Sequence, residues 1–201
     1  MNLFTRLTAP AALAAAAIGV PADLYHFTID SRASVADTVL FKVHGWLLVL
    51  AMALLVVALA GIAQRLARRD GRLDPAPLAV LAMTFTGTVL VLGNISTEAF
   101  VMPQAGEAVS DPAGYWLSIT IASYALFGFG WAGVAVLSAR AGLVPWPVAA
   151  FLVLGGVIGF SPLPGSYVLL LAGAALLGRT IARRESAVET PVRPAEVPVA
   201  G

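Results

Sequence analysis

The sequence predicts an all-α integral membrane protein built as a bundle of six transmembrane helices. Of its 201 residues, 59% are hydrophobic and only 11% are charged, whereas a soluble domain carries about 25% charged residues. The hydrophobic residues also fall into long runs, and roughly 20 apolar residues are enough to cross a hydrocarbon layer about 30 Å thick. The approximate limits of the six runs are 7–27, 35–66, 75–101, 112–139, 145–160 and 162–181.

The first run is the weakest, because it is rich in alanine and is interrupted by Pro21. Residues 1–22 can also be read as a secretory signal peptide that ends before Asp23, and its removal would leave five helices. We favour a retained helix, because the segment carries a single positive charge before its apolar part and the polar residues 23–27 can continue the same helix.

The later runs carry start and packing signals of their own. Ser34 and Asp37 resemble a capping box, which predicts that the second helix begins before its apolar part. The third, fourth and sixth runs begin with a capping side chain followed by proline, a pair that favours a helix start: Asp74-Pro75, Asp111-Pro112 and Ser161-Pro162. Clustered glycines in the last three runs predict close helix packing: Gly128, Gly130, Gly133, Gly155, Gly156, Gly159 and Gly173.

The basic residues predict the orientation of the bundle in the cell membrane. Arginines are concentrated in alternate connections and after the last run, whereas the remaining connections hold only Arg32 and Lys42. Because basic residues favour the cytoplasmic side, we expect both termini and residues 67–74 in the cytoplasm, and residues 103–111 outside. Residues 1–184 form the predicted membrane domain, followed by a disordered cytoplasmic tail, 185–201, which is short, polar and rich in proline. The arginines concerned are Arg65, Arg68, Arg69, Arg72, Arg140, Arg179, Arg183 and Arg184.

Polar residues near the outer end of the third helix are the main chemical signal. If this helix starts at Pro75, Glu98 lies about 34 Å further along at 1.5 Å per residue, which is the outer boundary of the hydrocarbon. Asn94 lies one turn below it, on a helix face that also includes Gly87 and Val91.

Polar residues of the first two helices, Asp23, His26 and His44, are expected at the same level as Asn94 and Glu98. Charge that faces lipid is costly. We therefore predict that Glu98, Asn94 and His44 point inward, toward the first helix.

This group favours a protein that binds a lipid, a small hydrophobic molecule or a partner membrane helix near the outer leaflet. The predicted ligand-binding residues are Asn94, Glu98, His26, His44, Trp46 and Trp116. A purely structural alternative is that water hydrates the polar groups at the membrane boundary, or that they hydrogen-bond to one another and fix the register of the helices.

A membrane-embedded enzyme is the functional alternative. In an acid–base version, Glu98 or Asp23 transfers a proton to or from a lipid or isoprenoid-like substrate, with His44 or His26 as its partner. The residues that would line the cavity are Trp46, Phe100, Tyr115 and Trp116. In a metal-assisted version, His26, His44 and Glu98 are the candidate ligands, because imidazole and carboxylate groups suit zinc, although their spacing matches no established metal motif. A channel or transporter would need a polar path across the membrane, and the inner halves of the helices offer only hydroxyls, such as that of Thr84, to form it.

Composition argues against several other classes. The net charge of +1 is too small to attract nucleic acid. The sequence contains no cysteine, which excludes disulfides and thiolate metal sites. Lys42 is the only lysine, which disfavours a Schiff-base chromophore, and the sequence identifies no cofactor. The sequon Asn94-Ile95-Ser96 lies too close to the bilayer for glycosylation. The alanine, leucine and arginine usage is similar to that of multi-pass proteins from high-GC bacteria, but no motif implies a family.

Overall fold

The computed structural model describes residues 3–25, 38–67, 71–101, 115–159 and 165–189, and the regular structure within these ranges is entirely helical. It consists of α1 (Leu3–Tyr25), α3 (Val39–Leu66), α4 (Pro75–Ser96), the π-helical turn η2 (Thr97–Val101), α6 (Tyr115–Arg140), α7 (Trp146–Gly159) and α8 (Ser166–Glu189). This confirms the predicted all-α bundle of six helices.

Within the described ranges, four segments are long and apolar enough to cross a membrane: Leu3–Tyr25, Val39–Leu66, Pro75–Val101 and Ser118–Arg140. α7 is also apolar, but its 14 residues extend only about 21 Å, less than the thickness of the hydrocarbon layer. α8 begins later than predicted and continues through Glu189, past the predicted domain boundary at residue 184. The last two helices therefore form a hairpin of one short and one long helix.

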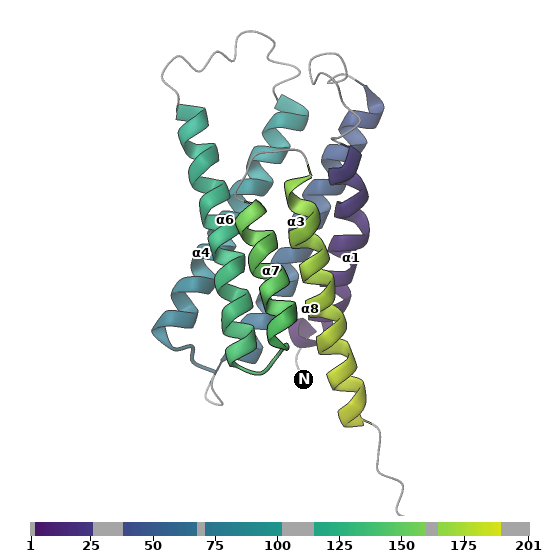
Figure 1. Cartoon of the computed structure of the whole chain (residues 1–201). Coiled ribbons are helices and arrows are strands. Elements are labelled where there is room, and N and C mark those ends of the chain that lie inside the picture. Colours follow the sequence, from purple (N-terminus) through teal and green to yellow (C-terminus); the bar gives the residue numbers. More distant parts are fainter. Residues whose placement is uncertain (1–2, 26–37, 68–70, 102–114, 160–164, 190–201) are drawn as a thin grey trace, which may run out of the picture.

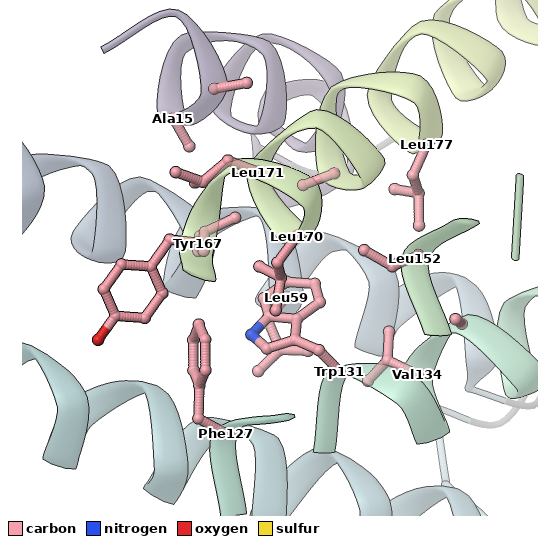
Figure 2. Packing of buried hydrophobic residues seen from close by; sticks show 14 of the residues in the cluster. Ala15, Leu59, Phe127, Trp131, Val134, Leu152, Tyr167, Leu170, Leu171 and Leu177 are labelled. Atoms are coloured by element: carbon pink, nitrogen blue, oxygen red, sulfur yellow. The ribbon is translucent and has the colours of Figure 1, made fainter. Parts of the chain in front are cut away.

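The helices form a closed ring (Figure 1). Each packs against its neighbours in sequence, and α8 packs against α1, so that the order around the ring is α1, α3, α4, α6, α7, α8. Figure 2 shows Phe127 of α6 and Tyr167 of α8 facing each other in the core, with ring centroids 5.8 Å apart. Large apolar side chains that are at most 1% exposed fill the ring: Leu48, Met52 and Leu55 of α3, Phe127 and Trp131 of α6, and Leu170 and Leu171 of α8.

The start of α1 and the end of α8 lie at the same end of the ring (Figure 1). We call this the arginine end, because α3 and α6 also end there with Arg65 and Arg140 in their last turns; the opposite end is the far end. Arg65 donates hydrogen bonds to Thr8 Oγ1 and to the Thr5 carbonyl oxygen, and so ties α3 to α1. Arg184 of α8 donates to the Gly142 carbonyl oxygen in the turn after α6.

Glycines bring neighbouring helices close together, as predicted for those of α6, α7 and α8 and also at Gly87 of α4. A Cβ atom on Gly87 of α4 would lie 2.5 Å from the carbonyl carbon of Leu126 in α6. One on Gly155 of α7 would lie 2.6 Å from the backbone nitrogen of Leu170 in α8. Neither position has room for a side chain, so the glycines set the distance between these helices.

The helix starts agree only in part with the sequence signals. α3 begins at Val39, and Thr38 rather than Ser34 is its N-cap, because Thr38 Oγ1 accepts a hydrogen bond from the Phe41 backbone nitrogen. α4 begins at Pro75 as predicted, but the Asp74 side chain makes no capping hydrogen bond. The pairs Asp111-Pro112 and Ser161-Pro162 lie outside the described residues.

Candidate functional site

Six buried polar or hydroxyl-bearing side chains lie toward the far end of the ring. We call this group, together with the half-buried Glu98 of η2, the polar layer; its members are Asp23 of α1, His44 of α3, Asn94 of α4, Ser123 and Tyr124 of α6, and Tyr167 of α8. Asp23, His44, Asn94 and Glu98 were predicted from the sequence. The contacts that follow connect these side chains from one helix to the next.

Asp23 links α1 to α8. Its Oδ2 atom accepts hydrogen bonds from the backbone nitrogens of Tyr167, at 2.9 Å, and Val168, at 3.0 Å. The first N–H groups of a helix have no partner within that helix, and a carboxylate also interacts favourably with the positive end of the helix dipole. Asp23 is therefore the cap of α8, although it lies in the last turn of another helix.

Asn94 links α4 to α6. Its Nδ2 atom donates to Ser123 Oγ at 2.6 Å, and Ser123 Oγ donates to the Thr120 carbonyl oxygen at 2.7 Å. The predicted inward face of α4 is confirmed, because Gly87, Val91 and Asn94 are all buried. The predicted direction was wrong for Asn94, which faces α6 rather than α1, since α4 lies between α3 and α6 in the ring.

Glu98 lies in the π-helical turn η2, where it is half-buried. The next residue, Ala99, is buried and packs against Gly45 of α3, where a Cβ atom would lie 2.5 Å from that of Ala99. Turns of this kind occur frequently at functional sites. Here the turn holds η2 against α3 and places Glu98 at the edge of the polar layer.

His44 is buried between aromatic rings at the α1–α3 interface. Its ring centroid lies 5.4 Å from that of Tyr25 in α1 and 5.6 Å from that of Phe41, so His44 points toward the first helix as predicted. Within the described ranges, no three His, Cys, Asp or Glu side chains come together in a way that could hold a metal ion. His26 lies outside these ranges, and the metal set that includes it stays a prediction.

The aromatic residues predicted to line a cavity are placed differently. Trp46 is 62% exposed and packs against Phe100, with ring centroids 4.8 Å apart, on the outside of the ring. It follows Gly45, which faces inward, and a step of one residue turns the next side chain by about 100° around a helix with 3.6 residues per turn. The side chains of Tyr115 and Trp116 are outside the described part.

Tyr124 and Tyr167 are members of the polar layer that the sequence analysis missed. Their rings stack with centroids 6.0 Å apart and an interplanar angle of 14°. Tyr124 directly follows Ser123, the partner of Asn94, and Tyr167 lies in the first turn of α8. Tyr167 lies near the predicted start of the sixth run at residue 162, so a search for hydroxyl-bearing residues at helix ends would have found it. Tyr124 lies well inside the predicted fourth run, 112–139, where no sequence signal singles it out.

The polar layer lies at the level where α7 ends and α8 begins. Gly156, near the end of α7, packs against Gly128 and Ala132 of α6, and the first turn of α8 lies at Tyr124. From Tyr124, α6 continues to its first residue, Tyr115, over about 13 Å at 1.5 Å per residue. This part of α6 projects past α7 and α8 and carries the exposed apolar side chains Ile119 and Ile121.

Comparison of the chain with protein family models, with curated proteins and with solved structures finds no match.

Proposed function

We propose that the chain is a multi-pass membrane protein that binds an amphipathic, lipid-like molecule in the far half of the ring. The polar end of this molecule interacts with the polar layer, and its apolar part lies along the projecting segment of α6. The observation that carries the proposal is that α1, α3, α4, η2, α6 and α8 all contribute polar side chains to one level of the ring, the level at which α7 and α8 stop.

The cost of burying these groups supports a functional role. Polar and ionisable groups within a membrane protein are expensive, and they usually face the interior of the bundle or a wet cavity. Asn94 donates a hydrogen bond to Ser123, and Asp23 caps α8. The buried Tyr167 hydroxyl makes no hydrogen bond to the described residues, and we assign it to the polar end of the bound molecule, together with the Tyr124 hydroxyl and the Glu98 carboxylate that share the polar layer.

The arginine end faces the cytoplasm in this proposal, because Arg65 and Arg140 lie there and basic residues favour that side. Both termini are then cytoplasmic, and the polar layer lies in the outer leaflet.

Binding is favoured over catalysis by the position of Asp23. Its Oδ2 atom already accepts two backbone hydrogen bonds, which suits a structural role better than proton exchange.

The proposal is tested by native mass spectrometry and lipid extraction of the full chain, purified in mild detergent. The unmodified protein is expected to retain one amphipathic molecule per chain. Thr120→Phe is expected to lose it, because Thr120 Oγ1 is buried one turn from Tyr124. Thr86→Phe is the matched control, because Thr86 is an exposed threonine of α4 outside the polar layer and the projecting segment of α6, and it is expected to keep the molecule.

The proposal is contradicted if the unmodified protein retains no amphipathic molecule. It is also contradicted if both variants unfold at the same temperature as the unmodified protein and retain the molecule equally. Glu98→Gln separates binding from catalysis. A binding protein with this change keeps its fold and its ligand, because the glutamine amide still offers an oxygen acceptor to the bound molecule, and only its stability changes. An acid–base enzyme would lose turnover of the retained molecule, because an amide cannot supply a proton.

A further inference from the structure

The contact around Gly178 fixes the level of α8 relative to α1. A Cβ atom there would lie 3.0 Å from both the Ala12 Cβ atom and the Ala9 carbonyl oxygen of α1. The two helices are antiparallel, because the start of α1 and the end of α8 lie at the same end of the ring (Figure 1). Toward the arginine end, Arg183 comes five residues after Gly178, and Arg6 comes three residues before Ala9. The two arginines therefore lie within one helical turn of the same level.

Positive charge is in excess at this end of the α1–α8 pair. Arg6, Arg179 and Arg183 are exposed, and none of them forms a hydrogen bond or ion pair with another residue in the described part of the chain. Residues 3–9 of α1 and 178–189 of α8 together contain four arginines and two glutamates. Even with both glutamates counted in full, the net charge of these two segments is 4 − 2 = +2.

Apolar side chains continue from these arginines toward the middle of the ring. Leu176, Arg179 and Arg183 of α8 are spaced by three and four residues and so share one face of the helix, and Leu13 lies two turns from Arg6 on one face of α1. Leu13 is 41% exposed and Leu176 is 38% exposed. The seven residues from Arg6 to Leu13 span about 10 Å, which lies within the roughly 15 Å that one leaflet contributes to a hydrocarbon layer of about 30 Å. We call the surface formed by these five residues the α1–α8 basic face.

We propose that the α1–α8 basic face binds an anionic phospholipid from the leaflet at the arginine end. The phosphate lies between Arg6 of α1 and Arg183 of α8, and one acyl chain lies along Leu13 and Leu176. Basic residues at the end of a membrane helix attract anionic lipid headgroups, and arginine can bind a phosphate group through two donors at once. An acidic protein segment would meet the arginines but would gain nothing from the leucines deeper in the leaflet. This site lies away from the polar layer and does not depend on the function proposed for it.

The test uses the full chain in nanodiscs that contain phosphatidylcholine and a minor fraction of phosphatidylglycerol, with native mass spectrometry to identify the lipid that stays bound. Both lipids carry a phosphate group, but only phosphatidylglycerol has a net negative charge. Phosphatidylglycerol is expected to be retained several-fold in preference to phosphatidylcholine. The double variant Arg6→Gln with Arg183→Gln is expected to lose most of this preference.

A matched double variant removes the same charge from the same end of the ring: Arg72→Gln, before α4, with Arg140→Gln, in the last turn of α6. It is expected to keep the preference, because neither α4 nor α6 is next to α1 or α8 in the ring. All four arginines are exposed, so both double variants are expected to fold.

The path of the acyl chain is tested separately. Leu176→Ser is expected to weaken retention of phosphatidylglycerol, because it places a hydroxyl where the chain packs. Leu154→Ser is the control, since Leu154 is an exposed leucine of α7 outside the α1–α8 basic face, and it is expected to leave retention unchanged. Equal effects of the two substitutions overturn the path assigned to the chain.

Equal retention of the two phospholipids by the unmodified protein overturns the preference for anionic lipid. An equal loss of preference in the two double variants overturns the location, because the total charge of the arginine end would then attract the lipid. Thr120→Phe is expected to leave phosphatidylglycerol retention intact, which separates failure at this site from failure at the polar layer.

Discussion

Asp23 lies in the last turn of α1, but the two backbone nitrogens that donate to its carboxylate belong to the first turn of α8. Other polar side chains also act between helices. Trp131 Nε1 of α6 donates to Thr88 Oγ1 of α4 at 3.2 Å, and Arg65 of α3 bonds to Thr8 of α1. Hydrogen bonds of this kind help to hold helices together where lipid removes the hydrophobic drive for association.

Removal of the Asp23 carboxylate is expected to destabilise the fold. Asp23→Ala leaves the buried Tyr167 N–H group without its acceptor, whereas the Val168 N–H group keeps the Gly165 carbonyl oxygen. An unsatisfied buried N–H group costs about 1–3 kcal/mol in the free energy of unfolding. Asp23→Asn is expected to cost less, because the amide oxygen still accepts. The control is Asp74→Ala, since Asp74 also precedes a helix but its side chain makes no capping hydrogen bond. Equal effects of Asp23→Ala and Asp74→Ala on unfolding in detergent would contradict this role.

The sequence was sufficient to predict that Asn94 and His44 point inward, but not which residues they contact. The depth of Asn94 follows from its distance along the helix from Pro75, and its inward direction follows from the cost of a polar group facing lipid. Its partner, Ser123, depends on which helix lies beside α4. Hydropathy carries no information on that point, so the prediction that Asn94 faces the first helix was wrong.

At the scale of helices, Gly61 allows the closest approach between α1 and α3. A Cβ atom at this position would collide with Thr8 Oγ1 and lie 2.5 Å from the Phe4 carbonyl oxygen. Thr8 is itself fully buried and accepts the hydrogen bond from Arg65. The packing of the two helices and the bond from Arg65 therefore depend on the same small residue.

Gly61→Ala is expected to lower the free energy of unfolding by about 1–3 kcal/mol, the usual cost of forcing an extra group into a packed interface. Gly93→Ala is the matched control, because Gly93 also lies inside a helix but a Cβ atom there would meet nothing within 4 Å. That change is expected to stabilise the fold by up to about 1 kcal/mol, through the higher helix propensity of alanine. Thermal unfolding of both variants in the same detergent gives the comparison, and destabilisation of similar size in both would refute the close approach at Gly61.

Helix identity was predictable from the sequence to a greater extent than helix length. The uncharged stretch from Gly45 to Ala63 identified α3, and the glycines of α6, α7 and α8 correctly indicated close packing. The end of α7 at Gly159 agrees with the predicted end of the fifth run at residue 160, but the π-helical turn after Ser96 was not predicted. This turn packs against another helix through the contact between Ala99 and Gly45, which local composition does not reveal.

For the whole molecule, closure of the ring by α8 and α1 is the feature that hydropathy could not reveal. Runs of apolar residues predict how many helices there are, but α1 and α8 are separated by almost the entire chain. The contact between them depends on Asp23 and on small residues such as Gly178, which packs against Ala9 and Ala12. Closure also places the start of α1 and the end of α8 at the arginine end (Figure 1).

The orientation of this ring across the membrane is tested most directly by labelling single cysteines, because the chain contains none of its own. Ala76→Cys, in the exposed first turn of α4, and Ser186→Cys, near the exposed end of α8, both lie at the arginine end. Gln104→Cys lies in the connection predicted to be outside. An impermeant maleimide applied to intact cells is expected to label only Gln104→Cys, and to label the other two after permeabilisation. Labelling of Ala76→Cys in intact cells, or labelling of Ala76→Cys and Ser186→Cys from opposite sides, would contradict a six-helix ring with its arginine end in the cytoplasm.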